Sequence, residues 1–131
     1  MAVISTELSM DPLKKTAATL KLALSAEPKN DLERDGVIQR FEYTFELSWK
    51  TLKRYFETTT SVEEFNIKNL FREAGKQKLI DSVENWFGYA KARNQTSHIY
   101  DQTIAGTVFE EAKKFSRDVE ILISRLEKKL G

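Results

Sequence analysis

The stretch LERDGVIQRFEYTFELSWKTLKRYFE, residues 32–57, decides the fold of this chain. Only Gly36 weakens it as a helix, and its large apolar side chains recur at steps of 3 or 4 residues. On a helical wheel, at about 100° per residue, these side chains fall within roughly 60° of one another. They are Ile38, Phe41, Phe45, Trp49, Leu52 and Phe56. The spacing predicts one long helix with an aromatic stripe that faces a core.

A second apolar face lies nearly opposite this stripe, at Tyr43 and Leu47. A helix that is apolar on two faces usually packs against two partners. We therefore expect either a second helical layer or a contact between two copies of the chain.

The segments at the two ends of the chain also carry helical spacing. Ser9 or Asp11 is expected to cap a first helix with Pro12 in its first turn. Its inward residues are Leu13, Ala17, Leu20 and Leu24. Asp101 or Thr103 is expected to cap a last helix that runs to about residue 129. Its inward residues are Ile104, Val108, Ala112, Phe115, Val119, Leu122 and Leu126.

Two shorter helices are expected between them. Asn66 can cap one over residues 67–77, with Leu70, Phe71 and Ala74 inward. Asp81 or Ser82 can cap the next, whose apolar face is Val83, Trp86, Phe87 and Ala90, with Tyr89 off that face. The pattern predicts an all-α fold, an antiparallel up-down bundle of four or five helices.

Composition limits the classes of function. The chain has 131 residues, which suits a single domain over 1–131, with 40% hydrophobic and 31% charged residues. The net charge of +1 argues against a broad basic surface for DNA. With no cysteine and one histidine, neither a disulfide nor a metal site is expected, and nothing calls for a cofactor. Residues 1–10 lack the pattern of a signal peptide, and no apolar run suits a membrane span, so we expect a cytoplasmic protein.

The segment RNQTSHIYD, residues 93–101, holds the only histidine, His98. Arg93 offers a planar fork of donors for a phosphate, and histidine exchanges protons near neutral pH. If the fourth helix continues through this segment, Asn94 and His98 share a face, and Arg93 lies about 140° from His98. The set fits metal-independent cleavage of RNA, in which a base activates the ribose 2′-OH and Arg93 stabilises the growing charge.

The pattern alone leaves plainer interpretations open. By pattern alone, an arginine five residues before a histidine is more typical of a helix end with a surface salt bridge than of a catalytic pair. Glu42 and Glu46 flank the aromatic stripe of residues 32–57. They form either a solvated flank, with Glu46 paired to Lys50 at i,i+4, or a support that reaches and orients Arg93.

Residues 93–101 resemble the R-x4-H-x-Y motif of the HEPN superfamily, and more narrowly its HepT-like branch, the nucleotidyltransferase substrate-binding proteins. Residues 35–50 are similar to the second-helix signature of that family. Arg72-Glu73-Ala74 and Leu79-Ile80-Asp81 are similar to its middle section. The resemblance covers most of the chain beyond the first 30 or so residues.

The resemblance implies a helical bundle that forms a homodimer, with two Arg-x4-His sites facing a shared cleft. Arg93 and His98 would be catalytic in a metal-independent endoribonuclease, and Asn94 would be the supporting polar residue. Glu46 and Asp101 are further candidates for support. The partner would be a small MNT-type nucleotidyltransferase.

In this branch the pair resembles a toxin and its antitoxin. The partner would transfer AMP from ATP to Tyr100, which would place bulk and charge beside His98 and block RNA. Two other functions stay open. One is a non-catalytic subunit that delivers a substrate to the nucleotidyltransferase, which the near-neutral charge favours. The other is a structural bundle that only dimerises.

Overall fold

The structure, a computed structural model, describes residues 8–59 and 65–131. Residues 1–7, on which the expectation of no signal peptide largely rests, lie outside the described residues. The described part forms five α-helices and a short 3-10 helix and contains no strand. The helices are α1 (Asp11–Ala23), α2 (Asp31–Thr59), α3 (Ile67–Lys76), α4 (Val83–Asn94) and α5 (Gln102–Leu130), with the 3-10 helix η2 (Thr96–His98) between α4 and α5. The prediction of an all-α fold is confirmed.

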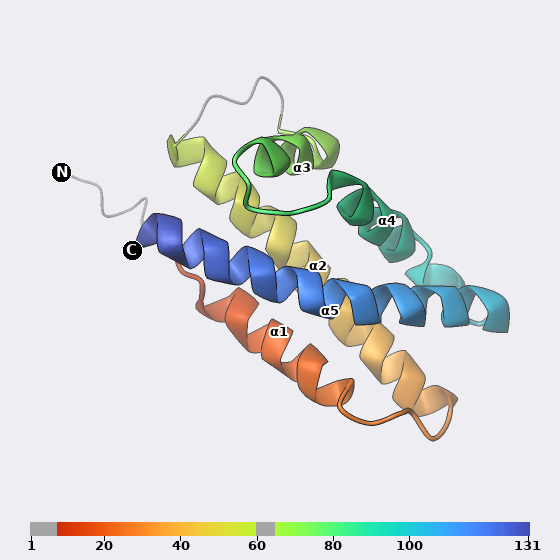
Figure 1. The fold of residues 1–131 in the computed structure, drawn as a ribbon. Coiled ribbons are helices and arrows are strands. Elements are labelled where there is room, and N and C mark those ends of the chain that lie inside the picture. The colour runs from red at the N-terminus through yellow and green to blue at the C-terminus, as the bar shows by residue number, and fades with distance from the viewer. Residues whose placement is uncertain (1–7, 60–64) are drawn as a thin grey trace.

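The four longer helices run alternately up and down the bundle. In Figure 1, α1 and α2 run in opposite directions, as do α4 and α5, while α3 lies beside the end of α2. Helix α2 contacts α1, α3, α4 and α5, so the stretch chosen from the sequence lies at the centre of the fold. Among the described helices, none is long and apolar enough to cross a membrane.

The aromatic stripe of α2 forms the core as predicted. Phe41 and Phe45 are buried, and the ring of Phe41 meets that of Phe115 from α5 edge-on, with centroids 5.2 Å apart. Phe45 lies 6.0 Å from Phe71 of α3. Trp49 is the exception in the stripe, since it is only partly buried. Helices α2, α3 and α5 are therefore joined by aromatic contacts, which prefer such edge-on geometry.

Local sequence signals set three helix starts. Asn66 accepts a hydrogen bond from the backbone N–H of Asn69 (2.8 Å), and Ser82 accepts one from that of Asn85 (3.1 Å). Asp101 caps α5 by accepting from the backbone N–H groups of residues 103 and 104. The expectation for α1 is wrong, because its N-cap is Met10, which makes no side-chain cap bond. Pro12 nevertheless lies in the first turn of α1, as predicted.

The prediction that Tyr89 lies off the inward face of α4 is wrong. Its side chain is fully buried, and its hydroxyl donates to Asp118 of α5 at 2.5 Å. Helix α4 turns Trp86, Tyr89 and Ala92 inward, while Val83, Phe87 and Ala90 lie at the edge of the core. A buried tyrosine needs a partner for its hydroxyl, and a carboxylate on the facing helix supplies it.

The two residues of the second apolar face of α2 differ in burial. Leu47 packs against the edge of the core, whereas Tyr43 remains 38% exposed. A contact between two copies of the chain at Tyr43 therefore stays a prediction.

Candidate functional site

The segment from residue 93 to 101 contains the last two residues of α4 and the short connection from α4 to α5. Helix α4 ends at Asn94, and η2 follows at Thr96–His98. The backbone N–H of His98 donates to the carbonyl of Gln95 (2.9 Å), and that of Asp101 donates to the carbonyl of His98 (3.1 Å). These bonds tighten the chain into short turns. Because α4 does not continue through His98, the condition under which Asn94 and His98 would share one helix face is not met.

Two carboxylates of α2 hold the guanidinium of Arg93. Its Nε donates to Glu46 at 2.8 Å, and its Nη1 lies 3.6 Å from Glu42. Glu46 also accepts a hydrogen bond from the indole of Trp49 at 3.1 Å. Of the two interpretations of these acids, the structure supports a contact that orients Arg93 and not a purely solvated flank. The Arg93 side chain is 33% exposed, so part of its donor fork still faces outward.

Thr96 joins the same network. Its hydroxyl lies 3.2 Å from a Glu42 carboxylate oxygen and 2.9 Å from the carbonyl of Arg93. The connection is thereby fixed to α2 at two side chains, Arg93 and Thr96. Sequence reasoning missed Thr96, although the spacing of Glu42 and Glu46 at i,i+4 already placed two acceptors on one flank of α2.

His98 and Tyr100 form a second, exposed pair. The Tyr100 hydroxyl lies 3.5 Å from Nδ1 of His98, and the rings meet at 71° with centroids 6.1 Å apart. Tyr100 is 81% exposed, one of the most exposed large side chains described. Asn94 is exposed as well. Both members of the pair are accessible to a large ligand.

The structure places Arg93 and His98 on one connection without joining them. Among the described residues, no hydrogen bond or ion pair links Arg93 to His98: Arg93 bonds toward α2, and His98 bonds toward Tyr100. The carboxylate of Asp101 caps α5, accepting from two backbone N–H groups. Its observed role is structural.

A further tie holds the far end of the connection. Arg34 of α2 donates to the side-chain oxygen of Gln102 (2.7 Å), and Gln102 in turn donates to Asp31 (3.0 Å). The first residue of α5 is thereby bound to the start of α2, directly after Tyr100 and Asp101. No sequence signal pointed to this tie, because its partners lie 68 and 71 residues apart.

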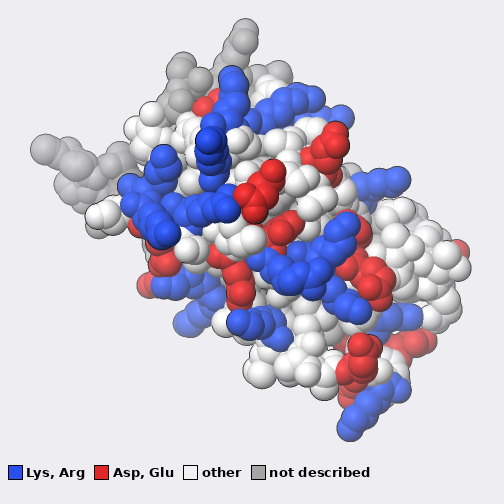
Figure 2. Space-filling model, viewed as in Figure 1, with Lys and Arg blue, Asp and Glu red and all other residues white. Residues whose placement is uncertain are grey.

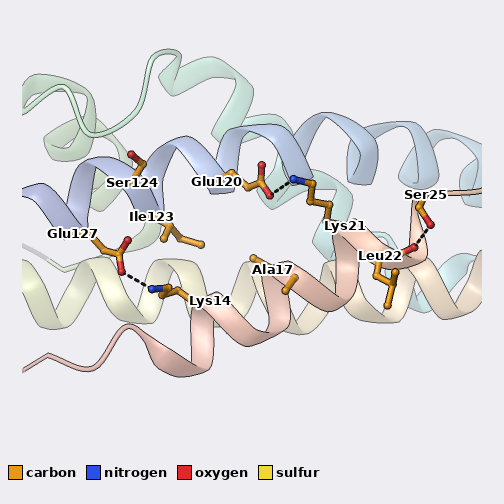
Figure 3. A pocket seen from close by; sticks show the side chains of 10 residues that line it. Lys14, Ala17, Lys21, Leu22, Ser25, Glu120, Ile123, Ser124 and Glu127 are labelled. Carbon is orange, nitrogen blue, oxygen red and sulfur yellow. Dashed lines mark hydrogen bonds and ion pairs between the residues drawn. The ribbon is translucent and has the colours of Figure 1, made fainter.

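Two other features bear on ligand chemistry. Within residues 8–59 and 65–131, no three His, Cys, Asp or Glu side chains gather as a metal site would need. A groove of about 630 Å³ lies between α1 and α5, lined by residues such as Ala17, Leu22 and Ile123 (Figure 3). Its lining includes none of the candidate site residues, so the groove is separate from the connection at 93–101.

Comparison with known proteins gives consistent relatives. The model of the family described as nucleotidyltransferase substrate binding protein like matches residues 8–128. A Haemophilus influenzae protein named probable ribonuclease HepT is 35% identical over 95 residues, which cover 70% of this chain and 65% of that protein. This chain thus spans slightly less than two thirds of that relative.

Two solved structures share the fold. A crystal structure of a Thermus thermophilus protein matches with a TM-score of 0.80 and 33% identity, covering 87% of this chain and 98% of that one. A Haemophilus influenzae structure, described as the fold of a substrate binding domain of a nucleotidyltransferase, matches with a TM-score of 0.80 and 28% identity. The match covers 91% of this chain and 99% of that one.

Proposed function

This chain belongs to the family of nucleotidyltransferase substrate binding protein like proteins, and on that premise we propose that it is a metal-independent endoribonuclease. In this proposal the chain acts as a homodimeric toxin and is neutralised when a small MNT-type nucleotidyltransferase attaches AMP to Tyr100. The observation that carries the proposal is the pairing of an oriented arginine, Arg93 on Glu46, with an exposed His98–Tyr100 pair on one short connection.

The proposed cleavage needs only side chains. His98 takes the proton of a ribose 2′-OH, the freed oxygen attacks the adjacent phosphorus, and the 5′-oxygen leaves. Arg93 stabilises the negative charge that grows on the phosphoryl oxygens. Glu46 keeps the guanidinium fixed before the substrate arrives, and Asn94 offers its amide to the ligand. The name of the HepT relative supports this class of activity.

The proposed homodimer accounts for the spacing of the two groups. Arg93 and His98 make no contact within one protomer, so a phosphate could be held between two facing sites in a shared cleft. The partly exposed Tyr43 on α2 supports such an interface, because it is an aromatic side chain on the helix that carries Glu42 and Glu46.

Neutralisation follows from the position of Tyr100. Its hydroxyl oxygen would attack the α-phosphorus of ATP, the bond to the β-phosphate would break, and pyrophosphate would leave. The exposure of Tyr100 suits access by a partner enzyme. The new phosphodiester would lie beside His98, where it would occupy the place of an RNA phosphate.

A second candidate function rests on the other relative. Because the structure of the Haemophilus influenzae neighbour was described as that of a substrate binding domain, this chain could instead bind a substrate and deliver it to a nucleotidyltransferase without cutting RNA. Arg93 and His98 would then be ligand contacts.

The deciding experiment combines mass spectrometry with a cleavage assay. The chain is co-expressed with its nucleotidyltransferase, and its intact mass and the modified peptide are determined. We expect one or more AMP groups on Tyr100, none on Tyr100→Phe, and cleavage of RNA only by the unmodified chain. His98→Ala should abolish cleavage and relieve growth arrest. An unmodified Tyr100 in a stable complex, together with no cleavage, would support the substrate-binding subunit instead.

A further inference from the structure

The C-terminal half of α5 carries a line of cations on its outer surface. At about 100° per residue, Lys114, Arg117, Arg125 and Lys128 fall within roughly 80° of the helix circumference. Figure 2 shows Lys and Arg groups gathered over this part of α5 and near the turn that follows α3. We call these four residues the α5 basic stripe.

The acids near the stripe are engaged by other groups: Glu111 pairs with the stripe's own Lys114 at 3.2 Å, and Asp118 accepts a hydrogen bond from Tyr89 of α4. Glu120 and Glu127 lie roughly 100–120° from the middle of the stripe, on the side of α1. There Glu120 pairs with Lys21 at 3.3 Å and Glu127 pairs with Lys14 at 2.8 Å (Figure 3). Both acids are paired with cations of α1, although Glu120 also lines the hollow that follows the stripe.

A shallow hollow of about 320 Å³ lies along the stripe. It is lined by Arg117, Glu120, Ile121, Ser124, Arg125 and Lys128. In the described part of the chain, neither Arg117 nor Lys128 has a carboxylate within ion-pair distance. Arg125 is held in place by Asp81 at 2.7 Å. The hollow thus combines one fixed guanidinium with two cations that are available to a ligand.

The turn after α3 contacts the stripe through Arg125. Lys78 has a φ of 60°, a left-handed conformation that costs a residue other than glycine about 1–2 kcal/mol. Its carbonyl accepts a hydrogen bond from Arg125 at 3.3 Å, so this turn lies against the stripe. This conformation closes α3 in the common helix-end pattern, in which the N–H of Leu79 donates to the carbonyl of Ala74 and that of Lys78 to the carbonyl of Gly75.

We propose that the α5 basic stripe binds the phosphodiester backbone of the RNA that is cut at the connection before α5. From Lys114 to Lys128 the helix rises about 21 Å, at 1.5 Å per residue. That length suits successive phosphates of a chain and exceeds what one nucleotide needs. From Asp101 to Arg117 the helix rises about 24 Å, so a strand of several nucleotides would connect site and stripe. The near-neutral net charge of the whole chain still allows a local line of cations on one helix.

This inference rests on the proposed function for the identity of the ligand, so its test is made independent of cleavage. The probe is a fluorescent single-stranded oligoribonucleotide with 2′-O-methyl riboses, which lack the nucleophile and cannot be cut. Fluorescence anisotropy gives its Kd for the full chain at several salt concentrations.

The test variant is Arg117→Ala with Lys128→Ala. Its matched control is Lys15→Ala with Lys68→Ala, which removes two exposed lysines from α1 and α3. Each phosphate contact on single-stranded RNA contributes about 0.7 to the slope of log K against log salt. We expect the test variant to lose about 1.4 from the slope, so its affinity loss relative to the unaltered chain is about 25-fold greater at 0.1 M salt than at 1 M salt. The control should keep the slope of the unaltered chain.

Two results would overturn the inference: an unaltered chain that does not bind the probe, or a test variant that retains the full slope. Cleavage of ordinary RNA is scored separately on the unaltered chain. Binding that depends on the stripe without cleavage would contradict the ribonuclease and keep the stripe. Cleavage of RNA with an unchanged slope in the test variant would support the ribonuclease and contradict RNA binding by the stripe.

Discussion

At the residue scale, the side chain of Arg93 is held by two carboxylates, Glu46 and Glu42. A partly exposed ion pair contributes at most about 1 kcal/mol to stability, so the value of Glu46 lies in fixing the direction of the guanidinium. Misplacing a catalytic group by about 1 Å costs up to about 100-fold in rate.

Under the proposed ribonuclease function, replacing Glu46→Gln should reduce RNA cleavage by up to about 100-fold while leaving the Tm almost unchanged. Single-turnover cleavage and a thermal melt measure the two effects. Glu57→Gln is the matched control, since Glu57 pairs with Lys53 at 3.6 Å in an exposed pair on the same helix. A variant that loses stability and activity in proportion would indicate a purely structural role for Glu46.

Tyr89 gives a pH-dependent prediction. Burial, and then the hydrogen bond and charge of Asp118, raise the pKa of Tyr89 well above its ordinary value. The unfolded tyrosine loses its proton near pH 10, whereas the folded one keeps it. The stabilisation by Tyr89 is therefore complete below about pH 10 and is lost as pH rises above it.

Tyr89→Phe should cost about 1–3 kcal/mol at pH 7, because Asp118 loses its donor. Its stability should also fall less steeply than that of the unaltered chain above about pH 10. Urea unfolding at about pH 7, 9 and 10.5, on either side of that value, measures both. Parallel stability curves for the two proteins would contradict this account of the buried hydroxyl.

At the element scale, helix ends decided by neighbouring residues could be read from the sequence. The caps at Asn66, Ser82 and Asp101 each bond to a backbone N–H two or three residues on; Asn66 was predicted alone, whereas Ser82 and Asp101 were each one of two candidates. The end of α4 and the burial of Tyr89 were not, because they depend on packing against other helices. The Tyr89 hydroxyl finds its acceptor 29 residues later in the chain.

The cap of α5 can be separated from a chemical role of the same residue. Asp101→Ala should cost about 0.5–2 kcal/mol, whereas Asp101→Asn should keep the cap and most of the stability. If Asp101 acts only as a cap, the Asn variant also keeps full RNA cleavage. If the stable Asp101→Asn variant loses cleavage, Asp101 also supports the chemistry of the site and is not only a cap.

Helices α3 and α4 pack closely at Gly75. A Cβ at this position would lie 2.5 Å from a methyl group of Val83, so Gly75→Ala should cost about 1–3 kcal/mol through overpacking. Gly106→Ala is the matched control: no atom lies within 4 Å of its Cβ position, and alanine should stabilise α5 by about 0.5–1 kcal/mol. Chemical denaturation of both variants checks the opposite signs.

At the scale of the whole molecule, the sequence predicted the up-down bundle because one stripe on α2 and one on α5 dominate the core. The site was only partly predictable. The contact of an α2 acid with Arg93 was one of two interpretations of the sequence, whereas the bonds of Thr96 and Gln102 to α2 were missed. These link positions 54 and 71 residues apart, beyond the reach of helical spacing.

The proposed homodimer can be tested at Tyr43. Light scattering after size exclusion should give twice the monomer mass for the unaltered chain and the monomer mass for Tyr43→Glu, which should also lose RNA cleavage. Leu32→Glu is the control, because Leu32 is a more exposed apolar residue on the same helix (81% against 38%). If Tyr43→Glu still forms a dimer, the interface does not include Tyr43 and lies on another face.

The bond between Gln102 and Asp31 also sets when the site is completed during synthesis. Its two partners lie 71 residues apart, and Gln102 is the first residue of α5. A ribosome that has released α1 to α4 has therefore produced a chain whose α2 stripe still lacks Phe115 and whose connection has no anchor at its far end. A nascent chain remains without a finished site until α5 has emerged. A messenger truncated before α5 yields a chain without the core residues of α5 and without the anchored connection.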